Sequence, residues 1–256
     1  MNALIGYTGF VGQTLMKQTS FDELYRSTNI EEIIGKEFDT IVCAGAPAVK
    51  WLANKEPDND KRIIENLIDI LKTVKCNKFI LISTVDVFKD SYEADEDSLI
   101  EESDLQPYGL HRRLLEKFIT NNFTNSLIVR LPGLVGPGLK KNIIFDFLNE
   151  NNIDQVDSRG IFQFYPMVNL WSDIKIALKE NLNIIHLTSE PLSVKDIAEN
   201  AYNIKFKNEI LKIVPKYNLI TKHSSLYSST SKYQYSKKEV ITVIRAYAQS
   251  EMKKEL

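Results

Sequence analysis

The chain has 256 residues, of which 43% are hydrophobic and 26% are charged, and its formal net charge is −2. This composition is typical of a soluble globular protein with one large α/β domain, or one domain and a small appendage. A nearly neutral chain lacks the basic surface that binds nucleic acid, and no apolar run approaches the ~20 residues that span a bilayer. Cys43 and Cys76 lie in apolar stretches, which favours buried, reduced thiols. Met1 leaves no room for a targeting peptide before the first motif, so we expect a cytoplasmic protein that binds neither nucleic acid nor a membrane.

A glycine-rich turn follows the first apolar stretch of the chain. It reads Gly6-Tyr7-Thr8-Gly9-Phe10-Val11-Gly12, after an apolar run at residues 3–5 and before a helix-compatible segment at 11–17. In a strand–turn–helix of this kind the first glycine permits a sharp turn, the second lets the backbone approach a pyrophosphate, and the third lets helix and strand pack closely. The spacing favours dinucleotide binding over a plain strand–helix turn. The expected contacts are Gly6, Thr8, Gly9, Phe10, Val11 and Gly12.

Strands and helices are expected to alternate along the rest of the chain. The predicted strands are residues 21–26, 39–43, 78–84, 126–131, 162–165 and 184–187. The predicted helices are a short segment capped by Thr28 or Asn29, followed by 57–74, 107–119, 140–149, 172–178, 194–202 and 236–252. Continuous apolar strands between helices predict a doubly wound parallel α/β sheet of the Rossmann type. The interval from residue 19 to 39 is too short for two further strand–helix units, so one edge of the sheet should be trimmed.

The chain is predicted to form two parts. Residues 1–138 with about 168–190 should make the sheet domain, and residues 139–167 and 191–256, with shorter and mixed patterns, a small C-terminal part. Residues 89–104 carry eight carboxylates with no histidine or cysteine among them, which predicts a solvated loop and no metal site.

Polar residues at two points are candidates for chemistry. Ser83 and Thr84 end a buried strand, and ligands of open α/β sheets bind outside such strand ends. Tyr108 begins a helix, and Arg112 follows four residues later on the same flank. A neighbouring cation stabilises a phenolate, so we expect the pKa of Tyr108 to fall toward neutrality, which suits proton transfer. Each feature alone is equally typical of a surface pair or of a strand end bound to backbone.

Together, the motifs resemble the extended short-chain dehydrogenase/reductase family. Within it they are most similar to the NAD-dependent epimerase/dehydratase type, which modifies nucleotide sugars and includes 4-keto-sugar reductases such as the dTDP-4-dehydrorhamnose reductases. The matching stretches are residues 6–12, 83–88, 108–112, 130–138, which is similar to an Arg-x-x-x-x-Tyr-Gly-Pro segment, and 171–174. The resemblance extends over nearly the whole chain, although the last 70 or so residues match only in pattern.

The resemblance implies roles for the matching residues. Thr84 would hold the keto or hydroxyl oxygen of the sugar, and Tyr108 would be the acid/base. Arg112 stands where the family has a lysine that binds the nicotinamide ribose and lowers the pKa of the tyrosine. This is a departure, because a guanidinium is bulkier and keeps its proton. The further cofactor contacts that we expect are Arg26, Ser27, Ala44, Gly45, Ala46, Ser83, Tyr108, Arg112 and Pro132. The small C-terminal part would bind the substrate.

Four residues are candidate substrate contacts. Asp86 lies near the strand end, where a structural hydrogen bond is the alternative role. His111 lies one turn from Tyr108, where a packed histidine is the alternative. Lys140 and Asn142 open a helix at which the resemblance places contacts to the substrate's nucleotide, although lysines at a helix start are commonly solvated.

The end of the second predicted strand bears on the choice of cofactor. It carries Arg26 and Ser27 and no acid at the place where one would hold the adenosine ribose, which favours NADP(H) and leaves NAD(H) open. We therefore predict an NAD(P)-dependent oxidoreductase or epimerase acting on a small-molecule nucleotide sugar. The alternative is a catalytically silent NAD(P)-binding protein of a sugar pathway. Arg112 and the trimmed sheet edge favour this alternative. The charged surface of the Tyr108 helix neither requires nor excludes a homodimer.

Overall fold

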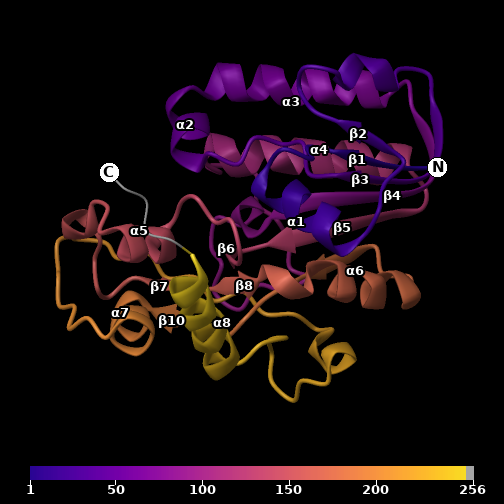
Figure 1. The fold of residues 1–256 in the computed structure, drawn as a ribbon. Helices are drawn as coiled ribbons and strands as arrows, with labels where there is room; N and C mark the ends of the chain where they lie inside the picture. Colours follow the sequence, from indigo (N-terminus) through magenta and orange to yellow (C-terminus); the bar gives the residue numbers. More distant parts are fainter. Residues whose placement is uncertain (252–256) are drawn as a thin grey trace. The chain divides into compact units, whose positions relative to one another are not determined.

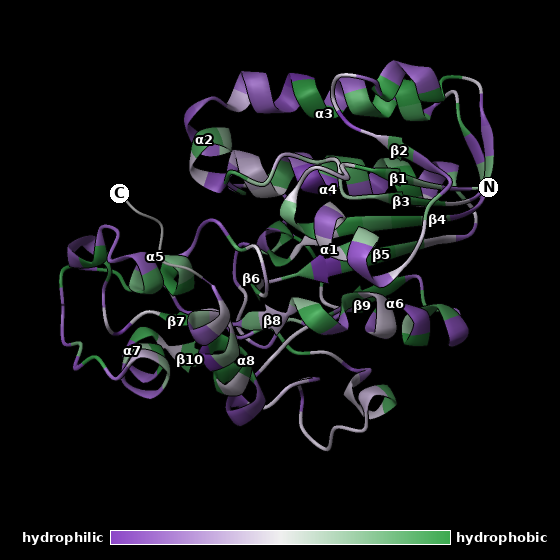
Figure 2. Cartoon of the chain, in the orientation of Figure 1, coloured by the Kyte–Doolittle hydropathy of each residue, from purple (hydrophilic) through white to green (hydrophobic). Residues whose placement is uncertain are grey.

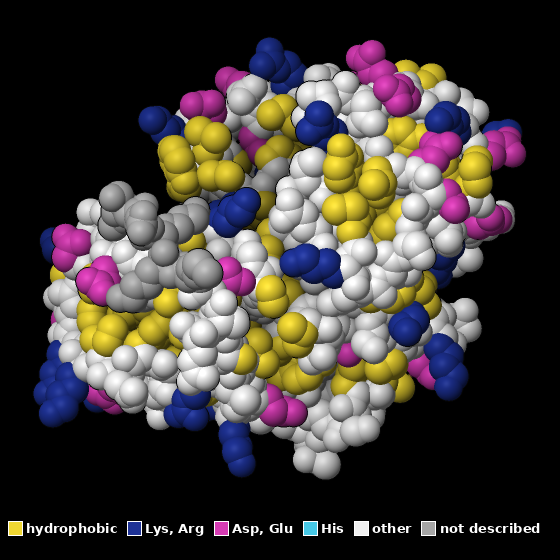
Figure 3. All heavy atoms as spheres, in the orientation of Figure 1, with side chains coloured by type: hydrophobic (Ala, Val, Ile, Leu, Met, Phe, Trp, Pro, Cys, Tyr) yellow, Lys and Arg dark blue, Asp and Glu magenta, His cyan; other side chains and the backbone are white. Residues whose placement is uncertain are grey.

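The computed structural model describes residues 1–251, which form two compact units (Figure 1). Unit 1 consists of Met1–Asp90, Asp97–Leu131 and Leu170–His186, and unit 2 of Ser91–Glu96, Pro132–Asn169 and the chain from Leu187 onward. Within residues 1–251, none of the helices combines the length and the apolar character that crossing a membrane requires. Lys and Arg side chains are interspersed with Asp and Glu on the visible face of both units (Figure 3), which agrees with the near-zero net charge.

A six-stranded parallel sheet forms the centre of unit 1. Across the sheet the strands are β2 (Glu23–Tyr25), β1 (Asn2–Ile5), β3 (Glu37–Cys43), β4 (Lys75–Thr84), β5 (Ser126–Leu131) and β9 (Ile184–His186). The strand order reverses between β1 and β3, which confirms the predicted doubly wound sheet and makes the ends of these two strands the switch point. β2 is an edge strand, as expected from the short interval between residues 19 and 39.

Helices flank the sheet of unit 1. They are α1 (Phe10–Gln18), α2 (Lys50–Lys55), α3 (Pro57–Leu71), α4 (Pro107–Asn122) and α6 (Leu170–Lys179), with short 3-10 helices η1 (Ile30–Ile33) and η2 (Val85–Val87). α3 and α4 lie side by side on one face, whereas α1 and α6 pack together, joined by a 2.8 Å hydrogen bond from the Trp171 N–H to Gln18 (Figure 1). The sequence did not predict α2, and the segment after Asn29 is a 3-10 helix of four residues rather than an α-helix.

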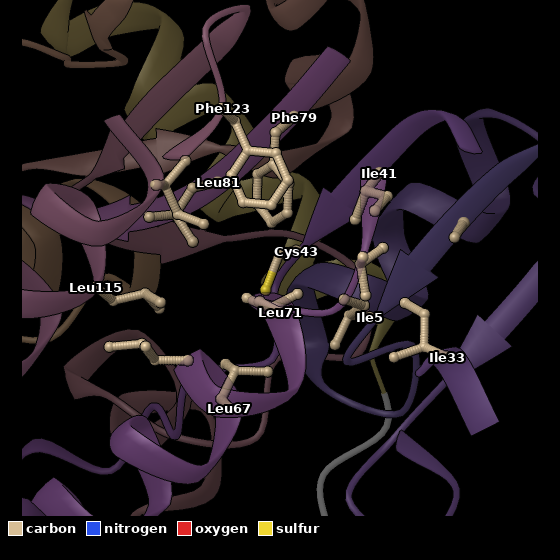
Figure 4. Packing of buried hydrophobic residues seen from close by; sticks show 14 of the residues in the cluster. Ile5, Ile33, Ile41, Cys43, Leu67, Leu71, Phe79, Leu81, Leu115 and Phe123 are labelled. Atoms are coloured by element: carbon tan, nitrogen blue, oxygen red, sulfur yellow. The ribbon is translucent and has the colours of Figure 1, made fainter. Parts of the chain in front are cut away.

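A hydrophobic core lies between the sheet and the α3–α4 layer. α3 buries Ile64, Leu67, Ile68 and Leu71, the three-to-four-residue spacing of a helix with one apolar face. These side chains pack against residues of β1, β3 and β4, and burying each contributes about 1.5–3 kcal/mol (Figure 4). Coloured by hydropathy, the strands are hydrophobic while the helices carry hydrophilic residues on their outer faces (Figure 2). This packing fixes where the strand ends lie.

Unit 2 is built from short helices and two small sheets. In the sheets, β6 (Gly133–Val135) pairs with β8 (Phe164–Pro166), and β7 (Ile161–Phe162) with β10 (Leu192–Ser193). The helices are α5 (Ile143–Asn149), α7 (Val194–Tyr202) and α8 (Lys237–Ser250), with 3-10 helices η3 (Ile153–Gln155), η4 (Met167–Asn169) and η5 (Ser224–Tyr227). α7 and α8 both begin with a capping box, in which a serine and the acid three residues later bind each other's backbone N–H.

Some expected boundaries differ from those observed. The strand predicted at 162–165 is two strands in different sheets, because Gln163 between them donates its amide to the carbonyls of Ser189 and Leu219. Residues 132–138 belong to unit 2, since β6 pairs with β8. Residues 91–96 also belong to unit 2 rather than being only a solvated loop, and Glu96 accepts a hydrogen bond from the Thr221 hydroxyl at 2.6 Å.

Candidate active site

The glycine turn joins β1 to α1 and depends on two of its glycines for its shape. Gly6 has a φ of +87°, and a Cβ at this position would overlap the carbonyl oxygen of Ala44. A Cβ on Gly12 would overlap the carbonyl oxygen of Gly6. Gly9 is different, because its Cβ would meet only the Gly6 oxygen, at 3.5 Å, an ordinary contact. Packing of the chain therefore requires glycine at 6 and 12, and it gives no reason for glycine at 9.

Several of the residues expected to contact a dinucleotide lie around this turn. The Ala44 N–H donates to the carbonyl of Ile5 at 2.8 Å, which places the loop of Ala44, Gly45 and Ala46 against the turn. The Gly6 N–H donates to the carbonyl of Tyr25 at 2.7 Å, which brings the end of β2 alongside as well. The side chains there are solvent-exposed, namely Thr8, Arg26 and Ser27.

Gly9 is exposed at the N-cap of α1, with no side chain capping the helix. A helix N-terminus left open in this way is suited to a phosphate, because its backbone N–H groups and helix dipole attract negative charge. The glycines therefore fit the pyrophosphate of a dinucleotide: two shape the turn, and the third keeps the approach to the helix clear.

Tyr108 is placed by contacts of the first turn of α4. A Cβ on Gly109 would overlap the carbonyl oxygen of Asp86, so glycine here allows α4 to lie directly against η2. Asn54 of α2 accepts the backbone N–H of Tyr108 at 3.0 Å and donates to the Gln106 side chain at 2.8 Å. The start of α4 is thus fixed from two sides.

The structure brings Thr84 and Tyr108 together. The Thr84 hydroxyl, at the end of β4, accepts the Asp86 N–H at 3.1 Å. It is also close enough to the Tyr108 phenol to favour the loss of the phenol's proton. Burial raises the pKa of Tyr108, and it outweighs the opposing effects of the Arg112 charge and the Thr84 hydroxyl. The predicted fall in this pKa was therefore wrong, because the phenol is more desolvated than its position at a helix start suggested. At neutral pH the phenol keeps its proton.

Arg112 is held by the protein itself. Its guanidinium stacks on the Tyr108 ring, 4.1 Å from the ring centroid, and is only 3% exposed. Its terminal nitrogens donate to both carboxylate oxygens of Asp60, one at 2.9 Å, and to the backbone carbonyls of Tyr108 and Pro47. Among the described residues, none accepts a hydrogen bond from its buried Nε. The expected role of Arg112 as a ribose ligand does not fit this arrangement, because its terminal donors are already engaged.

His111 also binds Asp60, its Nδ1 lying 2.7 Å from the carboxylate. The histidine is buried, as in the packed alternative that the sequence left open, and the substrate contact stays a prediction. Burial alone would raise the pKa of Asp60, but hydrogen bonds from Arg112 and His111 outweigh it and hold that pKa below its ordinary value. No pattern in the sequence indicated this role for Asp60, because an acid in the first turn of a helix is typical of a solvated position.

We expect the Asp60 cluster to make stability depend on acid pH. Because the pKa of Asp60 is lower in the folded than in the unfolded chain, its contribution is complete above pH ~4 and is lost as the pH falls further. The unfolding free energy, measured by urea titration at a series of pH values, should therefore fall more steeply below pH ~4 in the wild type than in Asp60→Asn. Asp58→Asn, an exposed neighbour on the same helix turn, should keep the wild-type slope. Equal slopes in all three proteins would contradict the assignment.

Ser83 belongs to a buried polar network. Its hydroxyl donates to Glu116 at 2.6 Å, and Arg130 donates to both oxygens of the same carboxylate at 3.0 and 2.8 Å. Arg130 also lies 3.2 Å from His186, and the carboxylate and guanidinium are almost completely buried. The Ser83 hydroxyl is therefore used inside the core, and the expected cofactor contact of Ser83 stays a prediction. An arginine within an otherwise apolar strand was the sequence signal for such a partner.

Asp86 has a partner that the sequence did not predict. Its carboxylate accepts a hydrogen bond from the ammonium of Lys50, at 2.7 Å, as an ion pair. Lys50 opens α2, the helix missing from the prediction.

The remaining expected residues lie in unit 2, where Pro132 is its first residue after β5. Asn142 caps α5 by accepting the Ile144 N–H at 2.9 Å, and its amide donates to the carbonyl of Leu134. Its side chain is therefore used in shaping this unit. Lys140 is exposed.

Comparisons with known proteins agree with this architecture. RMD from Pseudomonas aeruginosa complexed with NADPH superposes with a TM-score of 0.71 at 17% identity, covering 98% of this chain and 99% of that one. A dTDP-4-dehydrorhamnose reductase from Clostridium acetobutylicum gives 0.69 at 15% identity, covering 97% and 99%. UDP-glucuronic acid 4-epimerase from Bacillus cereus in complex with NAD gives 0.67 at 18%, covering 97% and 96%. At these identities the likeness shows the fold.

Among curated protein sequences, none is similar enough to the chain to count as a match. The model of the NAD dependent epimerase/dehydratase family matches residues 21–152, just over half of the chain. The glycine turn lies outside that match, so its geometry is an independent observation. Sequence match and fold agree, and the chain belongs to the NAD dependent epimerase/dehydratase family.

Proposed function

We propose that the protein is an NAD(P)-dependent oxidoreductase or epimerase that acts on a nucleotide-linked sugar. The observation that carries the proposal is that Tyr108, at the start of α4, lies close to Thr84, at the end of β4, in the same unit as the glycine turn. Ligands of doubly wound sheets bind at these strand ends. Membership of the family supports the proposal, as do neighbours in fold that include a dTDP-4-dehydrorhamnose reductase and a UDP-sugar epimerase.

Each residue of the pair has a defined task in this reaction. A bound nicotinamide ring supplies or accepts the hydride. Tyr108 moves the accompanying proton. Because the phenol keeps its proton at neutral pH, it is present in the form that can donate to the oxygen of a keto sugar. The Thr84 hydroxyl holds that oxygen by a hydrogen bond. The protonated phenol of the protein without ligand therefore suits the reduction of a ketone.

The cofactor would lie along the glycine turn, and NADP(H) is our preferred choice. Arg26 and Ser27 are exposed at the end of β2, where a guanidinium can accommodate a 2′-phosphate and where an acid would repel it. NAD(H) is the alternative. Isothermal titration of the protein with NADPH and with NADH separates the two, and Arg26→Asp should weaken the binding of NADPH much more than that of NADH.

The glycine turn gives a prediction that separates cofactor binding from folding. Gly9→Ala should leave the unfolding free energy nearly unchanged, because the new Cβ makes only an ordinary 3.5 Å contact, but it should weaken dinucleotide binding at least about tenfold. Gly12→Ala should lower both the unfolding free energy and the dinucleotide affinity. Its Cβ overlaps backbone atoms, which costs about 1–3 kcal/mol of stability. Urea unfolding and dinucleotide titration measure the two quantities. Unchanged dinucleotide affinity in Gly9→Ala would show that the dinucleotide binds elsewhere.

Turnover is tested directly by mixing the protein with NADPH and a panel of nucleotide-linked keto sugars, and following the loss of NADPH absorbance.

The second candidate function is a catalytically silent NAD(P)-binding protein. It is favoured by one observation, the engagement of Arg112 with Asp60 in place of a mobile cation. Turnover of any sugar in the panel excludes the silent protein, whereas tight cofactor binding with no turnover across the panel favours it.

A further inference from the structure

Helix α2 directs two side chains at the candidate active site. Lys50 begins the helix and forms an ion pair with Asp86 at 2.7 Å, and Asn54 accepts the backbone N–H of Tyr108 at 3.0 Å. Residues four apart lie on the same face of a helix, so one face of α2 contacts both η2 and the start of α4. The family resemblance assigns no role to this helix.

Four groups act on the phenol of Tyr108. Arg112 stacks on its ring from α4, Thr84 reaches it from β4, and the charges of Asp86 in η2 and Lys50 in α2 are close enough to affect its ionisation. Arg112 and Lys50 favour the phenolate, and Asp86 opposes it. The phenol is therefore influenced by two ion pairs, Arg112 with Asp60 and Lys50 with Asp86.

The two ion pairs differ in how completely they are enclosed. Arg112 and Asp60 have side chains only 3% and 5% exposed, and their hydrogen bonds fix the guanidinium in one place. In the second pair, the Lys50 side chain is 40% exposed and that of Asp86 20%. Without Lys50, the partly buried carboxylate of Asp86 would lose the compensation of this ammonium, and it would more strongly oppose the loss of a proton from the acid/base residue.

We propose that Lys50 is a positioning residue of this site, whose ammonium neutralises Asp86 and so keeps that carboxylate from opposing proton release by Tyr108. The inference rests on the proposed function, since it assigns to Tyr108 the transfer of a proton. It gives Lys50 a share in the electrostatic task that the sequence resemblance had placed on residue 112. Arg112 also favours the phenolate, and it stacks on the ring where Asp60 holds it in place.

The test is a titration of the Tyr108 phenol by NMR of the full chain, with isotope-labelled tyrosine and the Tyr108 signal identified by its loss in Tyr108→Phe. In Lys50→Met the pKa of Tyr108 should rise, because the ammonium that offsets the charge of Asp86 is removed. Lys50→Arg should restore the wild-type pKa, since it keeps the charge. Lys55→Met, which removes a lysine from the exposed end of the same helix, should have no effect.

A double variant identifies Asp86 as the intermediary. Lys50→Met combined with Asp86→Asn should return the pKa of Tyr108 toward the wild-type value, and Asp86→Asn alone should lower it. Asp86→Asn also keeps the inference testable if Lys50→Met does not fold. An unchanged titration in Lys50→Met, or a double variant that titrates like Lys50→Met alone, would overturn the inference.

Turnover supplies the second readout and separates this inference from the proposed function. With an accepted sugar, Lys50→Met should lower kcat about tenfold, with little change in KM, and shift the pH profile in the direction of the phenol titration. Lys50→Arg should recover most of the rate. If the wild type turns over no sugar in the panel, the proposed function fails, yet the titration still decides whether Lys50 controls the phenol.

Discussion

Replacing Tyr108 with phenylalanine should lower the turnover of a keto-sugar nucleotide by about 100- to 10,000-fold, the range for losing a general acid. Phenylalanine keeps the ring on which Arg112 stacks and removes only the hydroxyl near Thr84. The fold and the glycine turn should therefore be unaffected. Steady-state kinetics give the loss in kcat, and isothermal titration should show an unchanged dissociation constant for the dinucleotide.

The matched control for this variant is Tyr92→Phe, which removes the hydroxyl of an exposed tyrosine and should keep wild-type kcat. Thr84→Val completes the comparison. It removes the hydroxyl expected to hold the substrate oxygen, and it should lower kcat and raise KM while sparing dinucleotide affinity. Wild-type turnover in Tyr108→Phe would show that the proton comes from another group and would remove the basis of the proposed mechanism.

Replacing Glu116 with leucine should lower the free energy of unfolding by about 3–5 kcal/mol, the cost of leaving a buried charge without its partner. The carboxylate of Glu116 is the acceptor for Arg130 and for the Ser83 hydroxyl, and all three side chains are buried. In Glu116→Leu the guanidinium stays in the core with no carboxylate to compensate it. Urea unfolding, monitored by circular dichroism, measures the decrease in the free energy of unfolding.

Two further variants decide whether the loss comes from the unpaired charge. Glu116→Leu combined with Arg130→Met removes both charges and should recover much of the stability, because an apolar pair of similar volume avoids the desolvation cost. Glu102→Gln breaks a more exposed ion pair, with Lys117, and should cost at most about 1 kcal/mol. If Glu116→Leu costs no more than Glu102→Gln, the network contributes little to stability.

The sequence predicted the features that depend on local pattern. The continuous apolar run ending at Thr84 marked a central strand, and the spacing of Gly6, Gly9 and Gly12 marked the turn after the first one. Tyr108 followed Pro107, a residue typical of the first position of a helix, so its place near a strand end could be inferred from the alternation of strands and helices.

The partners of the buried charges could not be predicted. Asp60 and Lys50 lie 52 and 36 residues from Arg112 and Asp86 respectively, and neither has a local pattern that distinguishes it from a solvated charge. The pKa direction of Tyr108 was wrong for the same reason, since desolvation depends on which elements pack over the phenol. The break at Gln163 likewise depends on carbonyls from distant segments.

Both outer strands of the central sheet, β2 and β9, are only three residues long. An outer strand presents unpaired backbone groups to solvent, and a long one offers another chain a template for pairing. On β2, Glu23 is also engaged in an ion pair with Lys36, which adds charge at that margin. The trimmed side of the sheet therefore gives the protein resistance to edge-to-edge aggregation, even though its inner strands are continuous apolar runs.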